Sequence, residues 1–311
     1  MIISVIMLWP VISLLFLSFG DSQGLWKHLF ETVLIKYVST TLILMIGVVS
    51  LALIFGVSTA WIITRYNFLF KRYVDMILIL PAACPAYLVA YAYTDFFEYA
   101  GPVQNVIRTF FGWQNAQQYW FPEIRSLGGA IFVMSFVLYP YVYILARTSF
   151  LKSPSSFYEV AKLYNKNSFF SVGLPLARPA IIAGLALVCM EVISDFGTVE
   201  FFTVETLTLG IFKVWLGMNN LAGAAQIALI AFFLIICLLY VEKSARSKQR
   251  FHAPVKAGLD IAPKEIKLLP AVICSIFCLF PIICGFFLPV TILLDFVLNS
   301  QSLPSAIEVL N

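Results

Sequence analysis

Four carboxylates surround the outer end of one apolar stretch in the middle of the chain. Glu191, Asp195, Glu200 and Glu205 lie within or just after the apolar run 179–193. A carboxylate inside a membrane-spanning segment is costly and usually faces a cavity or a partner. Hard oxygen ligands of this kind attract cations. The spacing predicts a substrate pathway carried by Glu191, Asp195 and Glu200; the alternative is that these acids mark a helix end and are simply hydrated.

Motifs for catalysis and for resident cofactors are missing from the sequence. It contains no G-x-x-x-x-G-K-[ST] loop, no serine nucleophile elbow and no H-E-x-x-H. His28 and His252 are predicted to lie on opposite sides of a membrane, and Cys274 and Cys278 have no histidine or carboxylate near them. We therefore expect no metal site, cofactor or catalytic residue, and an intramembrane enzyme or an autonomous ion channel remains only a remote alternative.

A polar and basic island, residues 153–181, separates two long apolar stretches. It is expected to open as a short helix, either with Ser153 as the cap before Pro154 or with Ser156 and Glu159 as a capping box. Glu159 has two interpretations. It is either a capping residue or part of a helix that docks a cytoplasmic partner.

Two proline pairs close the island. Leu174-Pro175 and Arg178-Pro179 are expected to stop one helix and to begin the next. The island would then consist of one short helix, a turn and the start of a spanning helix.

The composition predicts an all-α polytopic membrane protein. Of the 311 residues, 61% are hydrophobic and 12% are charged, whereas soluble domains are nearer half apolar and a quarter charged. Mean hydropathy is +0.93. Nothing in the first residues resembles a cleavable signal peptide. The predicted spans are 2–19, 38–63, 76–93, 127–145, 179–193, 221–240 and 268–298.

Some of these stretches carry further structural signals. Ala52, Gly56 and Ala60 form a small-residue stripe that favours close helix packing, and prolines 81 and 85 predict a kink in the third span. Residues 94–126 are rich in aromatic side chains and are expected to form a loop along the membrane interface. Residues 198–220 are expected to be re-entrant or interfacial.

The distribution of basic residues predicts the orientation. With a cytoplasmic N-terminus, only five Lys and Arg residues fall outside, and the other 15 of 20 lie in inner segments. Such a bias within short loops follows the positive-inside rule and makes the island cytoplasmic. The five outer residues are Lys27, Lys36, Arg108, Arg125 and Lys213.

A weak internal repeat relates the two ends of the chain. The sequence from Pro10 to Leu15 resembles that from Pro289 to Leu294, which suggests the start of a second, similar half and a fragment or truncated product. The expected organisation is a first helix and outer loop (1–37), a transmembrane domain (38–245) with a cytoplasmic loop at 147–178, a cytoplasmic linker (246–267) and a truncated second half (268–311).

The island resembles the "EAA" loop of type I ABC-importer permeases, whose pattern is E-A-A-x3-G-x9-I-x-L-P. The matching residues are Glu159-Val160-Ala161 and Val172-Gly173-Leu174-Pro175. Asn165 occupies the glycine position, and six residues separate it from Val172 where the family has nine. The stretches 190–200 and 210–215 resemble the ferric-iron permease branch of this family.

This resemblance implies a fold and a set of partners. The fold would be a type I importer transmembrane domain of about six helices, with a seventh beginning a second half, in the bacterial inner membrane. Its partners would be a pair of cytoplasmic ATP-binding subunits, a periplasmic substrate-binding protein and membrane lipid, with no nucleic acid. The coupling loop would use Glu159, Ala161, Asn165, Leu174 and Pro175, and the substrate would be ferric iron or, alternatively, thiamine, sulfate, molybdate or phosphonate.

Overall fold

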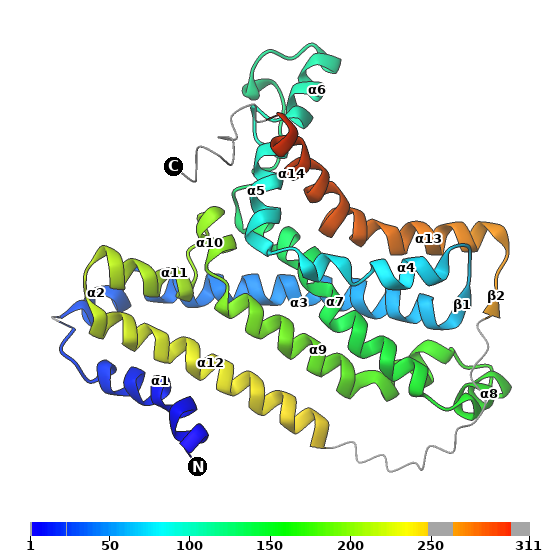
Figure 1. Ribbon diagram of the computed structural model, residues 1–311, viewed down its shortest axis with the longest axis horizontal. Helices are drawn as coiled ribbons and strands as arrows, with labels where there is room; N and C mark the ends of the chain where they lie inside the picture. Colours follow the sequence, from blue (N-terminus) through cyan, green and yellow to red (C-terminus); the bar gives the residue numbers. More distant parts are fainter. Residues whose placement is uncertain (1, 23, 248–263, 300–311) are drawn as a thin grey trace, which may run out of the picture.

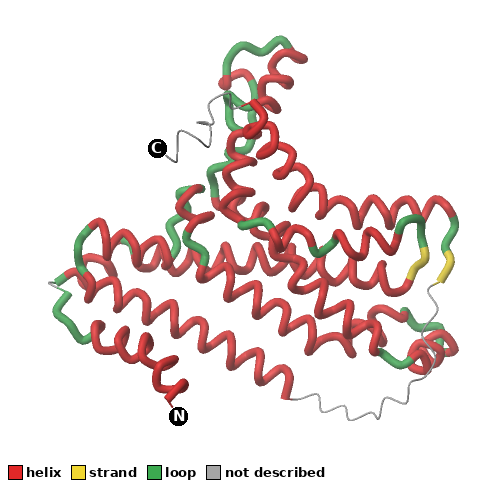
Figure 2. The backbone as a smooth tube through the Cα atoms, viewed as in Figure 1, coloured by secondary structure: helices red, strands yellow, loops and turns green. Residues whose placement is uncertain are grey.

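The computed structural model describes residues 2–22, 24–247 and 264–299, and it is almost entirely helical (Figures 1 and 2). The helices are α1 (Ile2–Ser18), α2 (Leu25–Thr32), α3 (Leu34–Arg65), α4 (Lys71–Ile77), α5 (Ala86–Phe97), α6 (Pro102–Phe111), α7 (Leu127–Lys152), α8 (Ser155–Leu163), α9 (Leu174–Ser194), α10 (Gly197–Phe201), α11 (Leu207–Phe212), α12 (Leu221–Ser247), α13 (Leu268–Ile282) and α14 (Leu288–Asn299). Short 3₁₀ turns occupy Leu80–Ala83 and Ala116–Gln118, and π-helical turns occupy Phe169–Gly173, Lys213–Gly217 and Ile283–Phe287.

The prediction of an all-α membrane protein is confirmed. Across the described residues, five helices are long and apolar enough to cross a membrane, and a bent pair makes six. They are Leu34–Arg65, Leu127–Lys152, Phe169–Ser194, Leu221–Ser244 and Leu268–Leu298, with Lys71–Ala83 and Ala86–Phe111 as the bent pair. The predicted first span forms α1, which has 17 residues and is shorter than these five.

Helices α3, α7 and α9 form the centre of the bundle, and α12 covers α9 with α1 on its far side (Figure 1). The small-residue stripe lies at this centre, where Ala52, Gly56 and Ala60 are all buried. A Cβ atom on Gly56 would stand 2.7 Å from Val142 Cβ on α7, and one on Gly184 of α9 would stand 2.8 Å from Val142 Cα. Glycines on both sides of Val142 therefore allow three backbones to approach closely.

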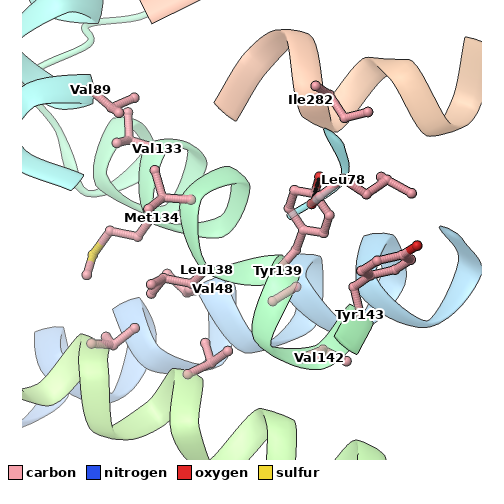
Figure 3. Close-up of a cluster of buried hydrophobic side chains, with 14 of the residues drawn as sticks. Val48, Leu78, Val89, Val133, Met134, Leu138, Tyr139, Val142, Tyr143 and Ile282 are labelled. Atoms are coloured by element: carbon pink, nitrogen blue, oxygen red, sulfur yellow. Dashed lines mark hydrogen bonds between the residues drawn. The ribbon is translucent and has the colours of Figure 1, made fainter. Parts of the chain in front are cut away.

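The third predicted span is broken as its prolines indicate. Lys71–Ala83 and Ala86–Phe111 meet at 91°. At the break the Ala82 N–H bonds Ile79 O at 3.1 Å and leaves the carbonyl of Leu78 without its usual helical donor. The buried hydroxyl of Tyr139 donates to that carbonyl at 2.9 Å, and Figure 3 shows the two residues side by side. In a dry interior such replacement donors are required.

A tyrosine hydroxyl also bonds an unpaired carbonyl at the π turn of the last span. In the turn Ile283–Phe287, the N–H of Leu288 bonds Ile283 O, and Pro289 has no N–H to offer Cys284 O. The buried Tyr93 hydroxyl donates to the Cys284 carbonyl, which ties α5 to the junction of α13 and α14. The broken third span and the last span, which contains this π turn, thus pack against each other, and α5 and α14 rise together from the bundle in Figure 1.

The aromatic segment 94–126 is not a continuous loop, contrary to the sequence prediction. It contains the last residues of α5 and the ten-residue helix α6, which begins at Pro102 after Gly101 and ends at Gly112 with φ +69°. Proline at the first helical position and glycine just past the end are ordinary helix boundaries. That sequence signal was available and could have identified α6.

The two strands are very short. β1 (Tyr66–Asn67) and β2 (Lys264–Glu265) run parallel and place the end of α3 beside the segment that leads into α13. Most of the predicted linker 246–267, together with His252, lies outside the described residues, as does the segment 300–311. The proposed division at residue 268 stays a prediction.

Candidate functional site

Helix α8 carries Glu159 and Ala161 of the EAA-like motif, and Asn165 follows its end. Glu159 is exposed, whereas Ala161 is buried with 6% of its surface accessible. Asn165 has φ +51°, in the left-handed region that a helix-ending residue adopts. Its N–H bonds Lys162 O at 3.0 Å, and the Lys166 N–H bonds Ala161 O at 2.9 Å. This pair of bonds is a Schellman motif, so Asn165 performs the turn that the family assigns to glycine.

The two predicted caps at the start of α8 are wrong. The first helical residue is Ser155, and the preceding Pro154 provides no side-chain cap. The Ser153 hydroxyl instead donates to Ser149 O at 2.9 Å, because this residue still lies against the last turn of α7. Glu159 is therefore not needed to cap its own helix.

The predicted helix break at Leu174-Pro175 is also wrong. The span is continuous from Phe169 to Ser194, with a π-helical turn up to Gly173 and Pro175 in the first turn of α9. Pro175 has no N–H to offer the carbonyl of Phe170, and the wide π turn, in which the Leu174 N–H bonds Phe169 O, accommodates the proline within the continuing helix. Leu174 and Pro175 thus lie near the start of a spanning helix, apart from α8.

The outward face of α8 is apolar. Phe157 and Val160 are 46% and 50% exposed, and Leu163 and Tyr164 are 85% and 74% exposed. The basic Lys162 and Lys166 are exposed beside them. A soluble surface rarely presents such a group without a partner, so this face has the character of a protein-binding site. The four apolar residues Phe157, Val160, Leu163 and Tyr164 are called the α8 face below.

The structure brings together two of the three predicted pathway acids. Glu191 and Asp195 line a cavity of about 270 Å³ at the break of the third span, next to Cys84 and Tyr141. The residues lining it are Ala82, Ala83, Cys84, Pro85, Ala86, Tyr87, Met134, Val137, Leu138, Tyr141, Glu191 and Asp195. These lining residues include no lysine or arginine, so the two carboxylates dominate its charge.

Asp195 also has a local structural role. Its carboxylate accepts the N–H groups of Thr198 and Val199 at 2.9 and 3.2 Å and the Thr198 hydroxyl at 2.9 Å. The side chain thereby caps the short helix α10 and fixes the turn after α9. Glu191 has no comparable bond to the backbone and is exposed, so it is the freer of the two acids.

Glu200 lies elsewhere. It lines two other cavities, of about 560 and 470 Å³, the first shared with Arg125 and the second with Glu205 and Lys213. Glu205 accepts Lys36 Nζ at 2.6 Å and Lys213 Nζ at 3.4 Å. The hydrogen bond from Lys36 holds the pKa of Glu205 below its ordinary value. The region around Glu200 is therefore mixed in charge, unlike the cavity at Glu191.

An ion pair that sequence reasoning missed joins α4 to α7. Arg147 binds Asp75 in bidentate fashion, with Nε–Oδ1 at 2.6 Å and Nη2–Oδ2 at 2.5 Å, and the Tyr143 hydroxyl also donates to this carboxylate. The sequence prediction placed Arg147 in the inner loop, but α7 extends to Lys152. No spacing in the sequence pairs residues 72 positions apart, so only folding reveals the contact.

Solved structures share this architecture. A crystal structure of a bacterial alginate ABC transporter, in complex with an alginate pentasaccharide-bound periplasmic protein, superposes with a TM-score of 0.59 at 15% identity, covering 80% of this chain and 92% of that chain. A second, of a bacterial ABC transporter involved in the import of the acidic polysaccharide alginate, gives 0.56 at 17% identity with 81% and 93% covered. At these identities the likeness is one of fold.

Curated relatives are similar over most of this chain. The Fe(3+)-transport system permease protein FbpB 2 of Haemophilus influenzae is 23% identical over 227 residues, which are 72% of this chain. The chain spans 40% of the length of that relative. The molybdate/tungstate transport system permease protein WtpB of Methanocaldococcus jannaschii is 27% identical, with 64% of this chain and 76% of the relative covered. The sulfate transport system permease protein CysT of Salmonella typhimurium is 27% identical, with 63% and 70% covered.

A family model covers the part of the chain that holds both candidate sites. The model of the binding-protein-dependent transport system inner membrane component matches residues 52–242, from the middle of α3 into α12. Its range includes α8 and the cavity at the broken span. The chain belongs to this family of inner membrane transport components, which are permease subunits of ABC importers and not enzymes.

Proposed function

We propose that this chain forms the translocation pathway of an ATP-driven importer, with ATP hydrolysed by a separate pair of cytoplasmic subunits. The observation that carries the proposal is the α8 face, an exposed apolar surface with basic flanks on a helix that projects beyond the spanning helices (Figure 1). A surface of this kind suits a groove on a soluble ATP-binding subunit. Glu159 lies exposed on the same helix and is available to that partner.

The proposed orientation places the N-terminus and α8 in the cytoplasm. The strong bias of Lys and Arg toward one set of loops supports it. The pairing of Tyr66–Asn67 with Lys264–Glu265 is also consistent, because both segments belong to loops assigned to the inner side. A periplasmic substrate-binding protein would then deliver the cargo at the opposite end of the bundle.

The proposed cargo is ferric iron. The cavity at the break of the third span presents Glu191 and Asp195 without a basic residue among its lining, and two carboxylates attract a hard cation and repel an oxyanion. A group of three His, Cys, Asp or Glu that could hold a metal ion is not found among the described residues. Sulfate or molybdate is the alternative, favoured by the relatives of 27% identity; thiamine or phosphonate remains a further one.

Replacement of Glu159 tests the docking role of α8. Glu159→Ala, expressed together with a candidate P-loop ATPase subunit, is expected to reduce co-purification of the ATPase while membrane insertion is unchanged. Glu123→Ala, an exposed carboxylate in the loop between α6 and α7, is the matched control. Recovery of the ATPase with Glu159→Ala at the wild-type yield would refute the docking role.

An uptake assay tests the cargo. Cells that contain the complete transporter are given radioactive ferric iron, sulfate or molybdate, and only ferric iron is expected to accumulate. Glu191→Ala should lower that uptake more than it lowers the amount of protein in the membrane, with Glu123→Ala again as control. Accumulation of an oxyanion in place of iron would decide for the alternative cargo.

A further inference from the structure

Helix α8 is attached to the bundle mainly through one large side chain. Tyr158 and Ala161 are its two buried residues, with 5% and 6% of their surfaces accessible. Ala161 is too small to fix the rotation of a helix. The Tyr158 ring is therefore the contact that can determine how α8 is oriented.

The Tyr158 ring lies on the charged end of α3. The guanidinium carbon of Arg65, the last residue of α3, is 3.6 Å from the centroid of this ring and 5.0 Å from that of Trp61. The rings of Trp61 and Tyr158 are themselves 6.2 Å apart. The three side chains form a stack in which one cation contacts two aromatic faces, a favourable arrangement for a desolvated guanidinium.

The ring contact is the main interaction of the buried part of the Arg65 guanidinium. Arg65 Nε, Arg65 Nη2 and the Tyr158 hydroxyl are buried, and none of them has a hydrogen-bond partner of ordinary geometry. The aromatic faces are thus the principal partners of the buried part of Arg65. A planar, weakly hydrated guanidinium can stack in this way, whereas the compact and strongly hydrated ammonium of lysine cannot.

Trp61 extends the stack to the other spanning helices. Its ring packs edge-on against Phe150 of α7 and Phe169 of the π-helical turn, with centroids 5.3 and 5.0 Å away. A Cβ atom on Gly173 would lie only 2.4 Å from Trp61 Cζ3, so the start of α9 also lies directly on the indole. The inner ends of α3, α7 and α9 therefore meet α8 at one tryptophan.

We infer that Arg65 and Trp61 are positioning residues that set the orientation of α8 and so connect the spanning helices to the α8 face. The functional meaning of this inference rests on the proposed docking function of α8. The positioning of α8 by Arg65 and Trp61 does not depend on it. Movement of an ATP-binding subunit against α8 would reach α3 through the Tyr158 ring and the Arg65 side chain. Loss of the stack should release α8 while the rest of the bundle stays folded.

A distance measurement between spin labels tests the positioning directly. Labels are placed at Leu163→Cys on α8 and Tyr73→Cys on α4, both exposed positions, after the six native cysteines are replaced. The parent protein should give one narrow distance distribution. Arg65→Lys should broaden or shift this distribution although the charge is kept, and Tyr158→Phe should not, because the aromatic ring that contacts the guanidinium is kept.

The controls separate positioning from general stability. Arg72→Lys changes a nearby exposed arginine in the same way and should leave the distances unchanged. Arg65→Lys should keep the unfolding temperature of the bundle. A narrow, unshifted distance distribution for Arg65→Lys would overturn the inference. A broad distribution together with a lowered unfolding temperature of the whole bundle would also overturn it.

The ATPase provides a second readout. If α8 docks the candidate ATPase subunit, Arg65→Lys should weaken its binding on the order of fivefold, and Tyr158→Phe should bind like the parent. If the parent protein does not bind the ATPase at all, the proposed function fails, but the distance measurement still decides whether Arg65 orients α8.

Discussion

At the scale of single residues, buried tyrosine hydroxyls compensate for broken helices. Tyr139 donates to the carbonyl of Leu78 and Tyr93 to that of Cys284, and in each case the usual N–H donor is engaged elsewhere or missing. A carbonyl left unpaired in an apolar interior costs free energy, so these hydroxyls permit the breaks.

Removal of the Tyr139 hydroxyl should destabilise the protein. Tyr139→Phe leaves the Leu78 carbonyl buried and unpaired, which costs about 1–3 kcal/mol of the free energy of unfolding. Tyr240→Phe, on the exposed face of α12, is the matched control and should be neutral. Thermal unfolding in detergent measures both, and equal stability of the two variants would contradict the role assigned to Tyr139.

The ion pairs of Glu205 should make stability depend on pH. The bond from Lys36 lowers the pKa of Glu205, so its contribution is full above the pKa of the unfolded chain, about 4.3. That contribution is lost as the pH falls through the lowered folded pKa. The unfolding temperature of the wild type should exceed that of Glu205→Gln at pH 7, and the difference should vanish in acid below that value. Glu123→Gln should show no such convergence, and a difference that persists unchanged in strong acid would exclude this linkage.

At the scale of elements, the contact of α3, α7 and α9 depends on glycine. Val142 of α7 lies against Gly56 on one side and Gly184 on the other, so neither helix can carry a side chain at these positions without moving. Small residues at helix contacts matter in membranes because close packing, and not burial from water, drives association there.

A methyl group at residue 56 should therefore separate two helices. Gly56→Ala would place a Cβ 2.7 Å from Val142 Cβ and 3.0 Å from Tyr139 O, and overpacking of this kind costs typically about 1–3 kcal/mol. Gly217→Ala has no atom within 4 Å of the new Cβ and serves as the control. Thermal unfolding should show a loss for Gly56→Ala alone; an unchanged midpoint would mean that α3 and α7 can shift apart freely.

At the scale of the whole molecule, charge and fold favour the same orientation. The segments assigned inside by charge include α8 and both partners of the β1–β2 pair, and they gather at one end of the bundle in Figure 1. The aromatic segment 94–126, which contains α6, lies away from that end. The α8 face would lie on one side of the membrane, and the aromatic segment 94–126 would lie on the other.

Cysteine labelling tests this orientation. In intact cells, a membrane-impermeant maleimide should label Gln117→Cys in the exposed loop after α6 and should not label Leu163→Cys on α8. After the membrane is opened, both should react. Labelling of Leu163→Cys in intact cells would reverse the proposed topology and remove α8 from the reach of any cytoplasmic subunit.

Much of this protein could be predicted from sequence because its signals are local. A bilayer requires long apolar helices, so the apolar runs predicted the six later spans, whereas the predicted span 2–19 forms the shorter α1; Pro81 and Pro85 predicted the break that the structure shows at 91°. Ala52, Gly56 and Ala60 were identified as a packing stripe by their spacing and are buried. Asn165 stands at the glycine position of the EAA-like motif, and its φ of +51° lies in the left-handed region.

Other features were decided only by the tertiary structure, because they join residues far apart in the chain. The capping predictions for Ser153 and Ser156 failed because α7 runs on to Lys152 and α8 begins at Ser155. Pro175 lies within the continuous span Phe169–Ser194 and does not end a helix. The Arg147–Asp75 pair, the Arg65–Tyr158 stack and the shared cavity of Glu191 and Asp195 depend on how helices pack side by side. Periodicity and local propensity determine where a helix forms, but side-chain contacts across the bundle determine what that helix faces.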